Sequence, residues 1–146
     1  MGGLGAACRP FGPCQGQTCV RTYLLDTCAF INAATAEGLG ASAKRVILNP
    51  HNERVMSALS VVEVAMAIER QRLDYTEKQV RKALDDLRVE IIPFRRQHAE
   101  RYFALPLRGH RNPIDRMIIA TALAEGIPIL TSDRRFKTYV GLEVIW

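Results

Sequence analysis

The sequence predicts an α/β protein, with a central, mainly parallel sheet and helices on both of its faces. Two observations lead to this prediction. From Arg21 onward, short apolar runs alternate with segments of helical periodicity, which is the pattern of strands joined by helices. Acidic residues follow apolar runs or open helices, at positions where the carboxyl ends of parallel strands converge. The 146 residues suffice for one domain with its own core.

The domain is expected to begin with a strand and two helices. Residues 23–25 form an apolar run and predict the first strand, and residues 27–36 predict the helix after it. A second helix is expected over residues 42–48. It should end at Asn49, because a residue before proline is pushed out of helical geometry.

The middle of the chain predicts two more strands, each followed by helical segments. Residues 54–58 and 90–93 are the expected strands. Three amphipathic helices are expected, over residues 61–73, 76–87 and 97–105. Thr76 is a plausible cap for the second of these, and Pro106 should stop the third.

The last forty residues carry the clearest local signals. Asn112 should cap a helix whose first residue is Pro113, and Gly126 should end that helix in the left-handed conformation. A buried strand, a short helix or turn, and a terminal strand are expected after it, over residues 128–131, 134–139 and 142–146.

The composition is that of a globular protein with a basic balance. The net charge is +5, a mild indication of an acidic partner such as nucleic acid. Apolar stretches stay well short of the roughly 20 residues that a membrane helix needs, so we expect no membrane span.

Residues 1–20 differ from the rest, since they are rich in glycine and cysteine, contain no acid and show no periodicity. They lack the continuous apolar segment of a signal peptide, so we expect a disordered extension before a domain spanning residues 21–146. An alternative is that translation starts at Val20, immediately before the first strand.

The cysteines indicate neither a zinc site nor a disulfide. Cys8, Cys14 and Cys19 lack the close C-x2-C pair usual in structural zinc sites. Cys28 is expected to be a small buried residue of the first helix. A reducing, cytoplasmic location is therefore the expectation.

Four carboxylates occupy comparable places in the pattern: Asp26, Glu63, Asp115 and Asp133. Each has a structural interpretation. Glu63 follows Ser60 and Asp115 follows Asn112 at capping-box spacing, while Asp26 and Asp133 can act as simple helix caps. The other interpretation is a joint one. Acids gathered at one sheet edge repel each other and raise each other's pKa unless a cation lies among them.

The cation that suits such a site is Mg²⁺, because it prefers oxygen ligands and one or two carboxylates can hold it. With it, water could attack a phosphodiester. Thr131 and Ser132 could orient an acid or contact a phosphate. His110 is expected to be an exposed loop residue and is left out of the chemistry. The basic residues near this edge are candidates for RNA backbone contacts: Arg111, Arg116, Arg134, Arg135 and Lys137.

Four segments of the chain resemble the PIN domain, specifically the VapC toxins of bacterial toxin–antitoxin pairs. They are Leu24-Leu25-Asp26-Thr27, then Ser60-Val61-Val62-Glu63-Val64 leading into Glu69-Arg70-Gln71-Arg72-Leu73, then His110-Arg111-Asn112-Pro113-Ile114-Asp115-Arg116, and finally Leu130-Thr131-Ser132-Asp133. The resemblance runs from about Arg21 to Trp146. Each motif is short, but four of them in this order are specific.

The resemblance implies a three-layer α/β/α fold and a magnesium- or manganese-dependent endoribonuclease. It also implies a homodimer that a cognate antitoxin protein holds inactive. Asp26 and Asp115 match the family's main metal ligands, and Glu63 and Asp133 match its further acids. The chain departs from the family at Asn112, where the family often has aspartate, and at Ile114, where it often has phenylalanine. The Asn112 change removes one negative charge beside the site.

Two other functions compete with this one. A PIN-like module could bind RNA or a partner without cutting. A phospho-acceptor signalling domain also gathers acids around Mg²⁺, but it would need paired acids at the first strand and a lysine beyond the late strand. Asp26 stands alone after the first strand, which disfavours the signalling domain.

Overall fold

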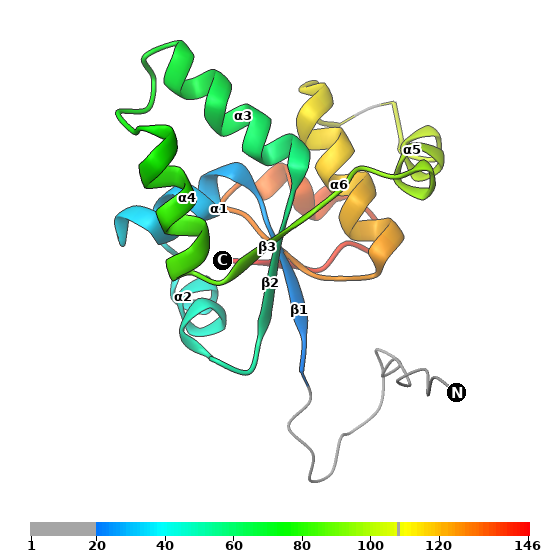
Figure 1. Cartoon of the computed structure of the whole chain (residues 1–146). Coiled ribbons are helices and arrows are strands. Elements are labelled where there is room, and N and C mark those ends of the chain that lie inside the picture. Colours follow the sequence, from blue (N-terminus) through cyan, green and yellow to red (C-terminus); the bar gives the residue numbers. More distant parts are fainter. Residues whose placement is uncertain (1–19, 108) are drawn as a thin grey trace, which may run out of the picture.

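A computed structural model describes residues 20–107 and 109–146 of the protein (Figure 1). Its centre is a single sheet of five strands in the order β3-β2-β1-β4-β5, and every neighbouring pair is parallel. The α/β class and the parallel sheet predicted from the sequence are confirmed. The extension expected for residues 1–20 and the cysteines Cys8, Cys14 and Cys19 lie, apart from Val20, outside the described residues.

The elements follow the predicted order. The strands are β1 (Thr22–Leu25), β2 (Glu53–Ser57), β3 (Val89–Ile92), β4 (Ile129–Leu130) and β5 (Val144–Ile145). The helices are α1 (Thr27–Thr35), α2 (Ala41–Leu48), α3 (Ala58–Glu69), α4 (Glu77–Asp86), α5 (Arg96–Phe103), α6 (Pro113–Glu125) and the short 3-10 helix η1 (Arg134–Thr138).

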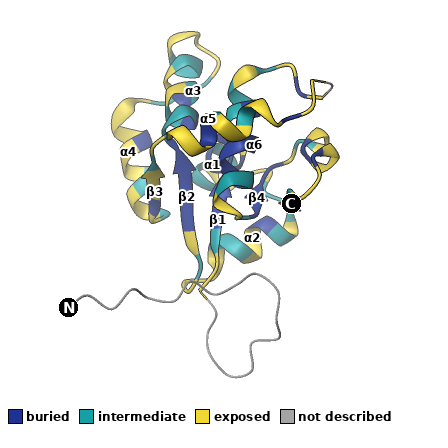
Figure 2. Cartoon of the chain, turned by 90° about the vertical axis from the view of Figure 1, so that its right-hand side faces the viewer, coloured by how far each residue is buried: buried dark blue, intermediate teal, exposed yellow. Residues whose placement is uncertain are grey.

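The sheet separates two apolar cores, because successive strand residues point to opposite faces. Leu25 and Met56 face the core under α1 to α4, whereas Leu24 and Val55 face the core under α5, α6 and η1. The central strands are accordingly buried and the outer helix faces exposed (Figure 2). This is the three-layer α/β/α architecture that the resemblance implied.

Local signals fixed most helix ends. The Thr76 side chain caps α4 in a capping box with Gln79, and Asn112 caps α6 with Pro113 in its first turn. Gly126 ends α6 with a φ of 66°, in the left-handed region that glycine tolerates best. These predictions are confirmed.

One predicted capping box is wrong. Helix α3 begins at Ala58, three residues earlier than expected, and its cap is Ser57, whose side chain accepts from the Leu59 N–H. Ser60 is fully buried inside the helix. The shift leaves Glu63 in the second turn of α3, where the helix N-terminus has no structural need for it.

No helix within the described part of the chain is long and apolar enough to cross a membrane.

Candidate active site

The strand order creates a crevice at the carboxyl ends of β1 and β4. From β1 the chain passes outward to β2 and β3, then returns to the other side of β1 with β4 and β5. Ligands of open α/β folds bind at such a reversal point. A cavity of about 670 Å³ lies here, and all four predicted acids line it: Asp26, Glu63, Asp115 and Asp133.

Asp26 directly follows β1 and has two roles in the fold. Its carboxylate caps α1 by accepting from the Ala29 N–H at 2.6 Å, so the structural interpretation of this acid is correct. Burial raises its pKa to about 6; hydrogen bonds from Thr131 and Ala29 oppose the rise, and the charges of Asp115 and Glu63 add to it. A carboxylate in this position gains from a nearby cation.

Glu63 reaches the crevice from α3 and is held by two neighbouring elements. One carboxylate oxygen accepts from the Thr27 hydroxyl at the start of α1, and the other accepts from the Asn112 amide at 3.4 Å. Asn112 therefore contributes an amide donor at the position where the family often has an aspartate.

Asp115 stands in the first turn of α6 and faces His110. Its Oδ2 lies 3.0 Å from Nδ1 of His110, although the two groups are not aligned as a hydrogen bond. Burial raises the pKa of Asp115, the neighbouring imidazole of His110 opposes this rise, and the charges of Glu63 and Asp133 raise the pKa further. The side chain of Asp115 therefore faces His110 and does not fill the capping-box role expected for it.

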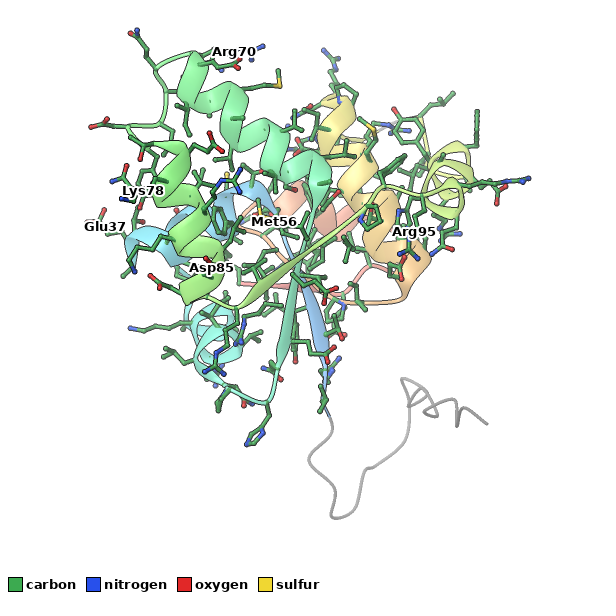
Figure 3. The ribbon with its side chains drawn as sticks, viewed as in Figure 1. Glu37, Met56, Arg70, Lys78, Asp85 and Arg95 are labelled. Atoms are coloured by element: carbon green, nitrogen blue, oxygen red, sulfur yellow. The ribbon has the colours of Figure 1, made fainter. Side chains whose placement is uncertain are left out.

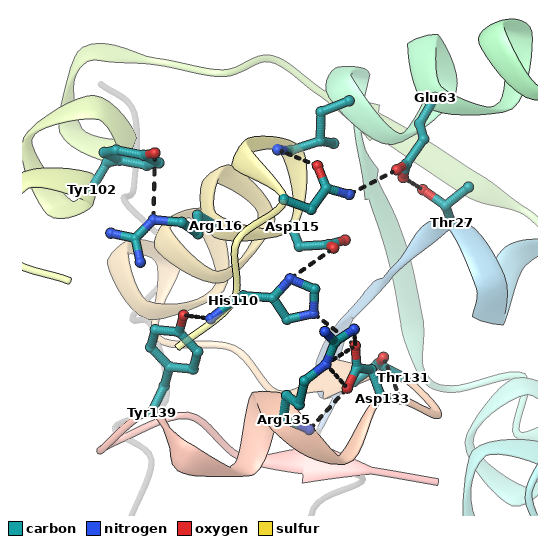
Figure 4. A network of polar contacts seen from close by, with 12 residues as sticks. Thr27, Glu63, Tyr102, His110, Asp115, Arg116, Thr131, Asp133, Arg135 and Tyr139 are labelled. Atoms are coloured by element: carbon teal, nitrogen blue, oxygen red, sulfur yellow. Dashed lines mark hydrogen bonds and ion pairs between the residues drawn. The ribbon is translucent and has the colours of Figure 1, made fainter. Parts of the chain in front are cut away.

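The buried position of His110 corrects the expectation that it would be exposed. Only 4% of its surface is accessible, and its ring lies between two acids, with Nε2 2.7 Å from Oδ2 of Asp133 (Figure 4). The Tyr139 hydroxyl accepts from the His110 backbone N–H at 3.0 Å, and the Phe136 ring packs edge-on against the imidazole. No local signal near His110 shows this, because its partners lie 5 to 29 residues away.

Asp133 follows β4 and is the acid most occupied by protein partners. Besides His110, it accepts from the Arg135 guanidinium at 2.7 and 3.0 Å and from the Arg135 backbone N–H at 2.9 Å. These hydrogen bonds, led by that of the Arg135 side chain, lower its pKa below its ordinary value. Asp133 is thus ionised but already engaged, and it caps η1 as predicted.

The smaller polar residues also lie at the crevice. Thr131 is buried, and its hydroxyl accepts from the Asp133 N–H at 3.1 Å and hydrogen-bonds Asp26, so it connects two acids. Ser132 is exposed and lines the cavity. Cys28 is exposed rather than buried and lines the same cavity, because its side chain points away from the core face of α1. Partial desolvation of the thiol by the cavity walls and the charges of the surrounding acids raise the pKa of Cys28 to about 11.

The predicted basic residues do not form one group. Arg111, Arg134 and Lys137 are exposed, and Arg135 lines the cavity while bound to Asp133. Arg116 is buried: its guanidinium donates to the Pro106 carbonyl at 2.9 Å and lies over the Tyr102 ring, away from the acids (Figure 4).

Two further arginines, which were not among the basic residues predicted to contact RNA, line the cavity. Arg70 and Arg72 follow the carboxyl-terminal end of α3, and Arg70 lies at the outer tip of that helix (Figure 3). They lie 41 and 39 residues before Arg111, the first of the other candidate cations in the sequence. Only the packing of α3 across the crevice brings them to its rim.

The donor set fits a magnesium-type ion held by few protein ligands. Across residues 20–107 and 109–146, no three His, Cys, Asp or Glu side chains are arranged to hold one metal ion. Mg²⁺ needs no such cage, because it usually keeps several waters and binds one or two carboxylates. Asp26 and Asp115 are the two acids whose pKa burial raises, so they gain most from a cation, whereas Asp133 is already paired.

Comparison with known proteins supports the fold described above. The PIN domain family model matches residues 23–142. No functionally curated protein matches the chain.

Solved structures share the fold at low sequence identity. One is VapBC2 from Rickettsia felis bound to promoter DNA, with 20% identity over 84% of this chain and 96% of that one and a TM-score of 0.63. Another is DNA-bound VapBC from Salmonella typhimurium, with 19% identity over 86% and 97% of the two chains and a TM-score of 0.63. A third is VapC20 of Mycobacterium tuberculosis, a toxin that cleaves the sarcin-ricin loop, with 17% identity over 83% and 98% and a TM-score of 0.56.

Proposed function

Because this chain belongs to the PIN domain family, we propose that it is a divalent-metal-dependent endoribonuclease and the toxin of a toxin–antitoxin pair. The observation that carries the proposal is the set of four acids lining one cavity at the reversal point of the sheet. Burial and mutual repulsion there raise the pKa of Asp26 and Asp115, as expected of carboxylates placed to share a cation.

In the proposed mechanism, Asp26 and Asp115 hold Mg²⁺ or Mn²⁺. Such an ion would supply a water that is a better nucleophile at neutral pH and would stabilise charge on a phosphate oxygen. Glu63, held by Thr27 and Asn112, keeps one face of the crevice acidic and in this proposal would accept a hydrogen bond from the attacking water. Thr131 fixes the orientation of Asp26 and of the Asp133 backbone.

We propose that exposed cations around the crevice bind the RNA backbone. Arg111, Arg134 and Lys137 are free of the acids, and Arg70 and Arg72 extend the basic rim along α3. Charge-assisted contacts to phosphates supply affinity without selecting a base sequence. Arg116 is left out, because its guanidinium is buried against Tyr102 and Pro106.

The cavity also suits the tail of a protein antitoxin. Beyond the acids its wall is apolar, with Ile31 from α1, Met66 from α3 and Ile114 from α6. A peptide that offers an arginine or lysine to the acids and an apolar side chain to this wall would block the crevice. An adjacent short reading frame encoding such a tail behind a DNA-binding start is expected. Its absence would favour a solitary nuclease.

The proposal also includes a homodimer located in the cytoplasm. Light scattering would test the oligomeric state, and cell fractionation would test the location.

The activity is tested with the purified protein and a labelled RNA. Cleavage should appear with Mg²⁺ or Mn²⁺, stop with EDTA, and fall by at least about a hundredfold in Asp115→Asn, because the variant loses a charged ligand while keeping its shape. Asp85→Asn is the matched control, since Asp85 is exposed on α4, away from the crevice (Figure 3). Full cleavage by Asp115→Asn would refute the metal assignment. RNA binding without metal-dependent cleavage in the unmodified protein would favour a binding-only module.

A further inference from the structure

One polar chain links the proposed metal ligand Asp115 to residues with no direct part in binding the ion. It runs from Asp115 through the two ring nitrogens of His110 to Asp133, and from Asp133 to Arg135 (Figure 4). We propose that His110 is a positioning residue, which fixes the carboxylate of Asp115 for metal binding and is itself fixed by Asp133. This inference rests on the proposed metal-dependent activity and adds a residue to it.

The burial of the imidazole shows that it is built into the fold. Its ring is packed against Phe136, and the Tyr139 hydroxyl holds its backbone N–H. Gly109, the residue before it, has a φ of 151°, and a Cβ there would lie 2.7 Å from the Tyr139 oxygen. The loop therefore comes so close to Tyr139 that only glycine fits at position 109. This close approach places the imidazole of His110 between Asp115 and Asp133.

The two ring nitrogens are unequally satisfied. Nε2 has Asp133 at 2.7 Å, and Asp133 is anchored in turn by Arg135 and by the Thr131 hydroxyl. Nδ1 is fully buried and has no aligned acceptor, yet Oδ2 of Asp115 lies only 3.0 Å from it. Because the group beside Nδ1 is a carboxylate, we assign this nitrogen as a donor, and a buried donor favours any orientation of Asp115 that completes the hydrogen bond.

That preference matters for the ion. If His110 holds one oxygen of Asp115, the other oxygen remains available to an ion in the cavity that Asp115 and Asp26 both line. Ligating carboxylates are commonly held by such outer partners, and removing the partner weakens metal binding by roughly ten- to a hundredfold. Asp133 then acts as the anchor of the imidazole, which explains why its oxygens are already occupied.

Two amide substitutions of His110 test the roles of its two ring nitrogens separately. In His110→Asn the amide nitrogen falls near the position of Nδ1 and can donate to Asp115. In His110→Gln it falls near Nε2 and can donate only to Asp133. His110→Leu removes both contacts. His98→Leu is the matched control, because His98 is also buried but lies outside the cavity. Its Nε2 is 2.6 Å from Oε1 of Glu125, and this contact joins α5 to α6.

Mn²⁺ affinity, measured by the EPR signal of the free ion, is the readout, and RNA cleavage is recorded beside it. Circular dichroism confirms that each variant is folded. We expect Mn²⁺ binding about ten- to a hundredfold weaker in the leucine and glutamine variants of His110, and within about threefold of the unmodified protein in His110→Asn and His98→Leu.

Unchanged affinity in folded His110→Leu would overturn the positioning role while leaving the proposed nuclease intact. Equal weakening in the Asn and Gln variants would overturn the specific link to Asp115. If the unmodified folded protein binds no Mn²⁺, the proposed function fails and this inference fails with it.

Discussion

Asp26→Asn should stabilise the metal-free protein at neutral and alkaline pH. The wild-type carboxylate is 7% exposed and lies near the charges of Asp115 and Glu63, so ionising it inside the fold is unfavourable. Asparagine is as good a helix cap as aspartate, so the hydrogen bond to the Ala29 N–H can be kept. The substitution therefore removes the buried charge and little else.

The magnitude follows from the shift in pKa. Burial raises the pKa of Asp26 from 3.8 to about 6, a change of about two units, and each unit corresponds to about 1.4 kcal/mol. Between these two values the folded state keeps a proton that the unfolded state has lost. Wild-type stability is therefore fully present below pH 4, falls as the pH rises through 6, and ends about 3 kcal/mol lower. The variant has no such loss.

Urea unfolding in EDTA at pH 4 and pH 8 measures the difference. The two proteins should be nearly equal at pH 4, and Asp26→Asn should be more stable by about 2–3 kcal/mol at pH 8. Asp74→Asn, an exposed position between α3 and α4, should show no such pH-dependent gain. Added Mn²⁺ should stabilise the wild type and not Asp26→Asn. The reasoning is refuted if Asp26→Asn is the less stable protein at pH 8 without metal.

Three further predictions concern residues outside the acidic cluster. Arg116→Met should lower the free energy of unfolding by about 2 kcal/mol, because the Pro106 carbonyl loses its charged donor, and should leave the RNA affinity of the folded protein unchanged. Arg111→Ala should do the opposite: unchanged stability, weaker RNA binding and a shallower salt dependence in filter binding. Gly40→Ala would place a Cβ against the carbonyl carbon and the indole ring of Trp146, too close for an undistorted backbone. It should cost about 1–3 kcal/mol and alter the fluorescence of Trp146, the only tryptophan; an unchanged melting temperature and spectrum would contradict the close packing.

The order of the elements was predictable because it depends on local signals. Apolar runs, the Thr76 and Asn112 caps, Pro113 and Gly126 act through neighbouring residues, and each of them works as expected. Two serines near the start of α3 could have capped it, and the packing of the helix selected one of them. Ser57 is the cap, whereas Ser60 is fully buried within the helix.

The acids themselves were recognised from their places in the strand and helix pattern, but their environments were not. Asp26 and Asp133 are both caps and cavity residues, so the structural and the chemical interpretations hold together for them. Arg116 was expected at the surface from its charge. Its burial depends on Tyr102 and on a loop carbonyl, and neither partner is visible from the sequence around it.

The sequence by itself determined the parallel α/β fold and the four carboxylates at the ends of its elements. The tertiary structure alone decided which neighbours each carboxylate meets. His110 shows the reason: its contacts with Asp133 and Tyr139 span 23 and 29 residues, and they form only after β4 and η1 pack beside the start of α6. Burial, repulsion and hydrogen bonding depend on distances in space, and they make two of the acids candidate ligands and the other two their supports.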